Sequence, residues 1–244
     1  MNINNKKEYP ATGSHGFKRR EFLKNGFILG SLTGISGLSL LSGCKEEAEE
    51  EISPSEDLML EHGLLNRILL IYDACKMHLI NREQFPPETL YNSALIIRSF
   101  IEEYHEKLEN DFIFPRFMKA GHLADLVQVL IEQHTAGRYI TDQIIKFGER
   151  PVLADTDESQ ILISLINDFN RMYRPHEARE DTILFPQLRK VFTPVEYFDL
   201  GEDFEKKEHE LFGEEGFEKM VEKVAAIERQ MGIYELSSFT PVPK

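Results

Sequence analysis

Two segments of the chain repeat a histidine and a glutamate at one spacing. HEKLENDFIFP occupies residues 105–115 and HEAREDTILFP occupies residues 176–186, so the two begin 71 residues apart. In each segment a Glu follows the first His by four positions, and Phe-Pro stands nine and ten positions after that His. Residues four apart on a helix share a face, and imidazole and carboxylate groups are metal ligands. The candidate ligands are His105, Glu109, His176 and Glu180.

A second pair of histidines accompanies these segments at nearly the same separation. LEHG at residues 60–63 recurs as EQHT at residues 132–135, 72 residues later, and supplies His62 and His134. The chain therefore consists of two similar predicted hairpins of helices. In each, a lone His lies on the first helix and a His-x-x-x-Glu pattern on the second. This arrangement predicts a metal site built from all four helices.

The elements that must position these residues are predicted to be helical. From residue 56 onward apolar residues recur at intervals of three and four, and no segment alternates as a strand would. One candidate His falls on the interior stripe of each of four expected helices. These helices are expected after Ser-Pro-Ser at 53–55, from about Pro87, after Gly121, and after the Asp-Thr-Asp turn at 155–157. A C-terminal amphipathic extension, residues 192–244, is expected to pack on them.

The alternative to a metal site is an ordinary core. A lone buried His is most often neutral with one hydrogen bond. Four of them alter the balance, because each unpaired buried polar group costs about 1–3 kcal/mol of the roughly 5–15 kcal/mol that a domain has. Two buried carboxylates without cations would cost more, whereas between metal ions they become bridging ligands. For Glu109 and Glu180 the remaining alternative is a solvated helix face.

The pattern over residues 56–191 resembles the hemerythrin-like family, also called the HHE cation-binding domain. The resemblance rests on the order lone His, His-x-x-x-Glu, lone His, His-x-x-x-Glu with Phe-Pro. It implies an all-α, antiparallel up-down four-helix bundle with a non-haem di-iron centre, so the implied cofactor is two iron ions. In that arrangement one iron would be held by His62 and His105, the other by His134 and His176, and both would be bridged by Glu109 and Glu180.

The sequence departs from the oxygen-carrying hemerythrins near two ligands. Arg138 stands where they have a second His. They also use an Asp five residues after the fourth His, and here Asp181 holds that place beside Glu180, the residue more typical of the wider family, so Asp181 is a further candidate ligand. Glu106, next to His105, is a candidate additional ligand. These departures argue against reversible oxygen carriage.

Three functions remain for such a site. The first is a binding or sensing module for oxygen or nitric oxide, or an iron-handling protein. The second is an enzyme that reduces peroxide or nitric oxide, since irons with open positions can do Lewis-acid and redox work. The third is a structural bundle that binds zinc or no metal.

The first 44 residues are predicted to be a targeting signal and not part of the folded domain. KRREFLK at residues 18–24 resembles the twin-arginine export signal, and an apolar run then leads to LSGC, which resembles a lipobox ending at Cys44. The alternatives are a short N-terminal anchor helix and an unmodified Cys. Residues 45–55, KEEAEEEISPS, are expected to form a flexible acidic tether. The chain is thus expected to be exported to the periplasmic side of the cell envelope and anchored to the membrane through a lipid on Cys44.

The composition of the chain disfavours some classes of binding partner. A net charge of −14 argues against nucleic acid, because that binding depends on Lys and Arg neutralising phosphates. The two cysteines lie in different contexts, so no disulfide framework is expected, and Cys75 is expected to be a buried, inert thiol. His209 lies in a charged run and is expected to be solvated. Tyr104, Tyr139 and Tyr173 lie within about a turn of the candidate ligands and could shape or gate the pocket, but they are expected to pack in the core.

Overall fold

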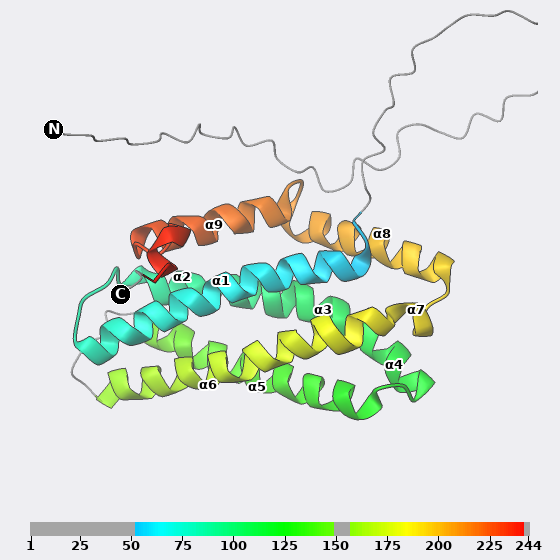
Figure 1. The fold of residues 1–244 in the computed structure, drawn as a ribbon, viewed down its shortest axis with the longest axis horizontal. Coiled ribbons are helices and arrows are strands. Elements are labelled where there is room, and N and C mark those ends of the chain that lie inside the picture. Colours follow the sequence, from blue (N-terminus) through cyan, green and yellow to red (C-terminus); the bar gives the residue numbers. More distant parts are fainter. Residues whose placement is uncertain (1–51, 149–156, 242–244) are drawn as a thin grey trace, which may run out of the picture. The chain divides into compact units, whose positions relative to one another are not determined.

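The computed structural model describes residues 52–148 and 157–241, and these residues form helices and their connections (Figure 1). The export signal, Cys44 and residues 45–51 of the expected tether lie outside the described residues. The elements are α1 (Pro54–Asn81), α2 (Glu88–Ile96), η1 (Ile97–His105), α3 (Glu106–Leu108), η2 (Glu109–Ile113), α4 (Phe114–Ala120), α5 (Ala124–Gly148), α6 (Asp157–Arg179), η3 (Glu180–Leu184), η4 (Phe185–Gln187), α7 (Leu188–Val191), α8 (Pro194–Phe212), α9 (Gly216–Gln230) and η5 (Leu236–Phe239).

Four long helical rods make the bundle. The first is α1, the second runs without a break from α2 to α4, the third is α5, and the fourth runs from α6 to α7. Successive rods run in opposite directions, as Figure 1 shows, and α1 packs against α6 while α5 packs against both α6 and α2. The predicted all-α, up-down four-helix architecture is therefore confirmed. Within the described residues no helix combines the length and apolar character that crossing a lipid bilayer requires.

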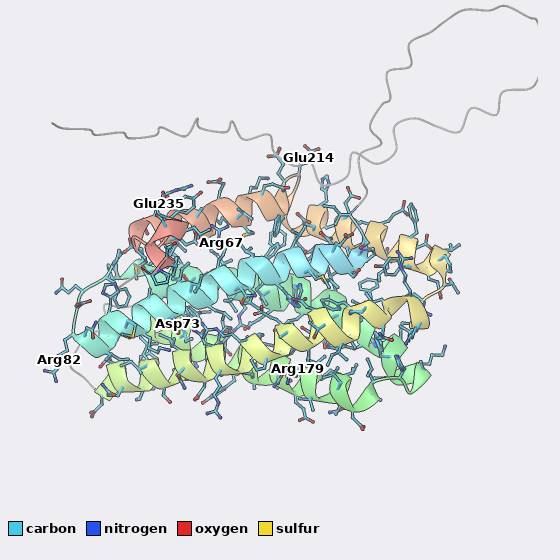
Figure 2. All side chains as sticks on the ribbon, in the orientation of Figure 1. Arg67, Asp73, Arg82, Arg179, Glu214 and Glu235 are labelled. Atoms are coloured by element: carbon cyan, nitrogen blue, oxygen red, sulfur yellow. The ribbon has the colours of Figure 1, made fainter. Side chains whose placement is uncertain are left out.

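The start of α1 is fixed by a capping box. Ser53 accepts a hydrogen bond from the backbone N–H of Glu56, and the Glu56 carboxylate accepts one from the backbone N–H of Ser53. Pro54 occupies the first turn, where its missing N–H costs nothing. The helix thus begins at Pro54, so the last two residues of the expected tether belong to α1. It ends at Asn81, and Arg82 caps it in a left-handed conformation at the exposed end of the helix (Figure 2).

Both His-x-x-x-Glu segments contain a wide helical turn after the glutamate. Glu109–Ile113 and Glu180–Leu184 are π-helical, and each is followed at once by Phe-Pro, at Pro115 and at Pro186. A proline cannot donate the i to i−4 hydrogen bond, and its ring clashes with the carbonyl four residues back. Widening the preceding turn removes that clash, and π turns of this kind are frequent at functional sites. The repeated Phe-Pro therefore ends each ligand-bearing segment in the same way.

The C-terminal helices cover one side of the bundle. Both α8 and α9 pack against α1, and α9 also contacts α2. Phe204 and Val224 are fully buried there, and the guanidinium of Arg67 on α1 donates to the carboxylate of Glu228 on α9, with 2.9 Å from Nε to Oε1. The helices α8 and α9 therefore pack on the outside of the four rods, and the candidate ligands lie between the rods.

Candidate metal centre

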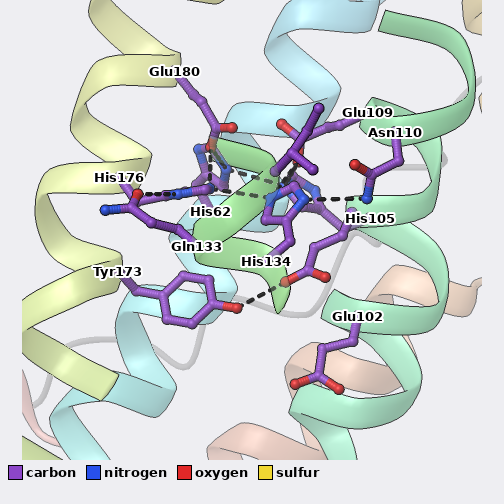
Figure 3. Close-up of polar contacts among 12 residues, drawn as sticks. His62, Glu102, His105, Glu109, Asn110, Gln133, His134, Tyr173, His176 and Glu180 are labelled. Atoms are coloured by element: carbon purple, nitrogen blue, oxygen red, sulfur yellow. Dashed lines mark hydrogen bonds and ion pairs between the residues drawn. The ribbon is translucent and has the colours of Figure 1, made fainter. Parts of the chain in front are cut away.

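The six predicted ligands meet in the middle of the bundle (Figure 3). None of their side chains is more than 4% exposed. In the part of the chain that the structure describes, they form two groups that could each hold a metal ion, with the potential ligand atoms of each group within 4.8 Å of one another. The groups are His62, His105 and Glu109, and His134, His176 and Glu180.

Within each group the two imidazoles present the same nitrogen to each other. The Nε2 atoms of His62 and His105 are 3.1 Å apart, and those of His134 and His176 are 3.2 Å apart. Two nitrogens that bind one ion with bonds of about 2.1 Å can be at most about 4.2 Å apart. The spacing of each pair therefore suits two imidazoles bound to one ion.

The two glutamates lie between the groups. One oxygen of each carboxylate, Oε2, approaches an Nε2 atom of both pairs. The separations are 3.1 Å for Glu180–His176, 3.4 Å for Glu180–His62, 3.4 Å for Glu109–His134 and 3.7 Å for Glu109–His105. Glu109 and Glu180 are thus positioned to bridge two ions.

The Nδ1 atom of each of the four pocket histidines contacts a polar side chain. The Nδ1 partners are Asp181 Oδ1 for His62 at 2.7 Å, Glu61 Oε2 for His105 at 2.7 Å, Gln133 Oε1 for His176 at 2.9 Å, and Asn110 Nδ2 for His134 at 3.2 Å. Carboxylate and carbonyl oxygens only accept, so the Nδ1 atoms facing them carry the proton. The Asn110 amide can present its oxygen after a 180° turn. The partners therefore leave the Nε2 lone pairs for the pocket, as in other metal-binding histidines.

The carboxylates of the pocket have imidazole nitrogens as neighbours but no well-aligned hydrogen-bond donor among the described residues. Among residues 52–148 and 157–241, both oxygens of Glu109 and both of Glu180 accept no hydrogen bond, although the two side chains are fully buried. An isolated buried carboxylate is strongly unfavourable. Two cations at the bridging positions would satisfy all four oxygens, so the residues present fit a dinuclear metal centre.

Without a cation, protons occupy the pocket. Burial lowers the pKa of His62, but its contacts with Asp181 and Glu180 outweigh burial and raise that pKa to about 10. Burial and the neighbouring Glu180 carboxylate raise the pKa of Glu109 well above its usual range. Burial lowers the pKa of His134 to about 3, which leaves that imidazole neutral, the form that binds metals. Metal binding is therefore expected to release protons.

Two phenylalanines cover the centre symmetrically. Phe185 stacks on the ring of His62 with centroids 5.5 Å apart, and Phe114 stacks on the ring of His134 at the same centroid distance. Both belong to the repeated Phe-Pro, and both are at most 2% exposed. They close the pocket on the side of the wide turns and help to exclude water from it.

Glu106 is not a member of either ligand group. Its carboxylate accepts hydrogen bonds from the Tyr173 hydroxyl at 2.8 Å and from Arg138 Nη2 at 2.7 Å. The physical reason is helix geometry, because a residue next to His105 points about 100° away from it. In this arrangement Glu106 faces Tyr173 and Arg138, so its role as an additional ligand stays a prediction that the geometry does not favour. Arg138, the substitute for a second His, supports Glu106 instead of facing the pocket.

The remaining candidates fall outside the pocket. His209 is exposed, and Cys75 is fully buried, where burial raises the pKa of its thiol. Tyr104 is buried against Phe100, as expected, but Tyr139 is 64% exposed, so its assignment to the core is wrong. Its position on α5 points away from the bundle.

Sequence reasoning missed three of the four Nδ1 partners. Glu61 and Gln133 directly precede a lone ligand histidine, and Asn110 directly follows Glu109. Asp181, the fourth partner, follows Glu180 and was considered only as a ligand. Their position next to a ligand in the sequence could have identified them, because a polar residue beside a ligand on a packed helix faces the neighbouring helix.

The chain is similar to one family and to several bacterial proteins. The model of the Hemerythrin HHE cation binding domain matches residues 53–188, which include all six pocket residues. Uncharacterized proteins of Mycobacterium bovis and of two strains of Mycobacterium tuberculosis are each 43% identical over 234 residues, covering 91% of this chain and 91% of the relative. No solved structure matches the chain.

Proposed function

Since the chain belongs to the hemerythrin HHE cation-binding family, we propose that it is an exported, membrane-tethered protein with two non-haem irons. Its role would be to bind or sense oxygen or nitric oxide, or to handle iron. The observation that carries the proposal is the pair of buried carboxylates, Glu109 and Glu180, which lie between two pairs of imidazole nitrogens and accept no hydrogen bond from the residues that the structure describes.

The donor set is compatible with iron and argues against several other kinds of metal site. The two groups contain only imidazole nitrogen and carboxylate oxygen, without a thiolate. Thiolate sites favour copper(I), structural zinc or iron–sulfur clusters, whereas all-oxygen sites favour magnesium or calcium. Six side chains shared between two ions also leave coordination positions open. A bound pair of irons would supply ligand binding at those positions and one-electron chemistry.

The protein's own residues prepare the pocket for a small ligand. The Nδ1 partners fix the four imidazoles, and Phe114 and Phe185 cover two of them. Burial of the whole set restricts the access of bulk water, which favours a small ligand such as a diatomic molecule or peroxide. Arg138, in place of another imidazole, leaves one more position open.

A second candidate function is an oxidoreductase that reduces peroxide or nitric oxide. The observation that favours it is the Tyr173 hydroxyl, which is buried, donates to Glu106, and belongs to a ring whose centroid is 5.5 Å from that of His176. Reduction of either molecule consumes protons, and the Tyr173 ring beside His176 carries a buried hydroxyl that is a proton donor. Turnover that disappears in Tyr173→Phe while metal content is retained would support this function.

Iron analysis tests the metal proposal. We expect about two irons per chain and a visible absorption band in protein purified from a low-oxygen culture. His134→Ala should reduce the iron content and alter the band, whereas His209→Ala, at an exposed histidine outside the pocket, should do neither. Protein that holds no iron, or that holds it equally well after His134→Ala, would contradict the proposal.

Export and anchoring need a separate experiment. The twin-arginine-like residues Arg19 and Arg20 and the lipobox-like Cys44 support them. Full-length protein should be recovered with the membrane fraction and be accessible from the periplasmic side. Cys44→Ser should release it from membranes, and replacing both arginines by lysine should retain it in the cytoplasm. A wild-type chain that is found soluble in the cytoplasm would contradict this part of the proposal.

A further inference from the structure

The four Nδ1 partners differ in charge between the two ligand groups. His62 and His105 are backed by carboxylates, Asp181 and Glu61, both at 2.7 Å. The other two histidines are backed by neutral amides at longer distances. These amide contacts are Gln133 to His176 at 2.9 Å and Asn110 to His134 at 3.2 Å.

The difference arises at equivalent positions of the two sequence repeats. Glu61 and Gln133 each precede the lone His of their repeat, and Asn110 and Asp181 each follow the Glu of their repeat. Each repeat therefore carries one carboxylate and one amide. Because Asp181 of the second repeat reaches across to His62 of the first, both carboxylates come to support the same ligand group.

Further buried charges do not cancel this difference. Glu177, 2% exposed, accepts from the Asn66 amide, which also donates to the backbone carbonyl of His62, so this carboxyl group adds no positive charge on that side. On the other side Arg138 lies one turn after His134, but it is paired with Glu106. The group of His62 and His105 therefore faces more negative charge than the group of His134 and His176.

A carboxylate behind an imidazole strengthens the metal bond. It holds the Nδ1 proton, makes Nε2 more basic and adds negative charge near the cation, and losing such a partner typically costs about 10–100-fold in metal affinity. An amide fixes the ring in the same orientation without the charge. Glu61 is fully buried whereas Asp181 is 33% exposed, so solvent screens Asp181 more and Glu61 should dominate.

We propose that the two metal positions differ in metal affinity because their histidines have different Nδ1 partners. The position of His62, His105 and Glu109 is the tight one and favours the ion of higher charge, and the position of His134, His176 and Glu180 is the exchangeable one. Loading is then sequential, with a stable one-ion form. This inference rests on the proposed dinuclear site and adds the order and the residues that set it, Glu61 and Asp181 against Gln133 and Asn110.

Exchanging the charges between the repeats tests the inference. The folded wild-type chain is titrated with Co²⁺ alone, and the ions are then withdrawn by a competing chelator, with metal content and the cobalt absorption bands as readouts. We expect two steps whose affinities differ by at least about 10-fold. Glu61→Gln should weaken the tight step by about 10–100-fold and leave the weak step unchanged. Gln133→Glu should strengthen the weak step, and the double variant should bring the steps together or reverse them.

Matched controls separate local from general charge effects. Gln128→Glu adds the same charge on α5 at an exposed position, and Glu202→Gln removes one from an exposed position of α8, so neither should move a step. If Glu61→Gln does not fold, Asp181→Asn at the partly exposed partner should shift the tight step in the same direction by less. Two equal steps in the wild type, or swaps that move both steps alike, would overturn the inference and leave the dinuclear site intact. Failure to bind any Co²⁺ would overturn both.

Discussion

At the scale of single residues, the orientation of the four imidazoles follows from helix geometry. A residue next to a ligand in the sequence points about 100° away around the helix and so faces a neighbouring helix. Glu61, beside His62, supports His105, and Asp181, beside Glu180, supports His62. Each helix therefore carries a ligand together with the support for a ligand on its neighbour, which makes the geometry of the pocket depend on how the rods pack.

The buried bridging carboxylates should make the metal-free and metal-loaded proteins respond oppositely to one substitution. Glu109→Gln removes a buried acid that has no donor, so the metal-free protein should gain about 1–3 kcal/mol in free energy of unfolding. The same change should lower metal affinity, because a neutral amide is a poor bridging ligand. Urea unfolding with chelator and with Co²⁺ measures both effects. Glu132→Gln, at a side chain outside the pocket, is the control, and a loss of stability in the metal-free Glu109→Gln protein would contradict the prediction.

Glu106 should give the metal-free protein a measurable pH dependence. Burial raises the pKa of Glu106 from 4.5 to about 8, since Arg138 and Tyr173 offset burial only in part. The folded state therefore holds this proton more tightly than the unfolded state between these values. The resulting stability is complete below about pH 4.5 and is lost as the pH rises through 8, with a slope of at most about 1.4 kcal/mol per pH unit.

Glu106→Gln isolates this contribution. The variant's free energy of unfolding should vary less with pH between 4.5 and 8 than that of the wild type, as measured by urea unfolding in the presence of chelator. Comparison of the two proteins removes the effect of all other titrating groups. Parallel pH profiles would show that Glu106 keeps an ordinary pKa, held down by its ion pair with Arg138.

At the scale of elements, α5 and α6 approach each other closely at a glycine. A Cβ added at Gly137 would lie 2.8 Å from Cζ of Tyr173 and closer still to its hydroxyl oxygen. Gly137 thus gives Tyr173 the space in which it reaches Glu106. The glycine is required by this close packing and not by an unusual backbone conformation.

Gly137→Ala should therefore destabilise the protein by about 1–3 kcal/mol through overpacking. Tyr173→Phe removes the atom that comes closest, so the double variant should recover part of the loss. Gly63→Ala is the matched control, because nothing lies within 4 Å of its Cβ, and it should add about 0.5–1 kcal/mol through its better helix propensity. Thermal or urea unfolding measures all four proteins. A Gly137→Ala protein as stable as Gly63→Ala would show that α5 and α6 can separate without cost.

The elements also show what a sequence can and cannot specify. The spacing of four between His105 and Glu109 places them on one helix face, and the repeat identifies the equivalent residues. The six pocket residues could therefore be predicted from the sequence. The side chains that contact the Nδ1 atoms could not be predicted, because the helix that Glu61 contacts depends on how the rods pack. The π-helical turns could not be predicted either. Pro115 shows that a backbone hydrogen bond is missing, but it does not show which conformation the preceding turn adopts.

At the scale of the whole molecule, the pocket couples metal binding to folding. Its ligands come from all four rods, which are separated by long stretches of chain, so no ligand set exists in the unfolded protein. The helices α8 and α9 contribute no residue to either ligand group. Metal should therefore stabilise the four rods together, and the stability of the folded chain should report how many ions it holds.

The dependence of stability on free metal concentration then counts the ions. An ion that binds only the native state adds about 1.4 kcal/mol to the free energy of unfolding for every tenfold rise in its concentration above Kd. With one tight and one weaker position, the slope should be about 1.4 kcal/mol per decade at low free Co²⁺ and about 2.8 kcal/mol per decade once both are filled. Urea unfolding in metal buffers measures the slope, and Mg²⁺, which prefers oxygen ligands, is the control ion that should give none. A slope that never exceeds one ion per chain would contradict a dinuclear centre, because the second group of His134, His176 and Glu180 would then hold nothing that the fold depends on.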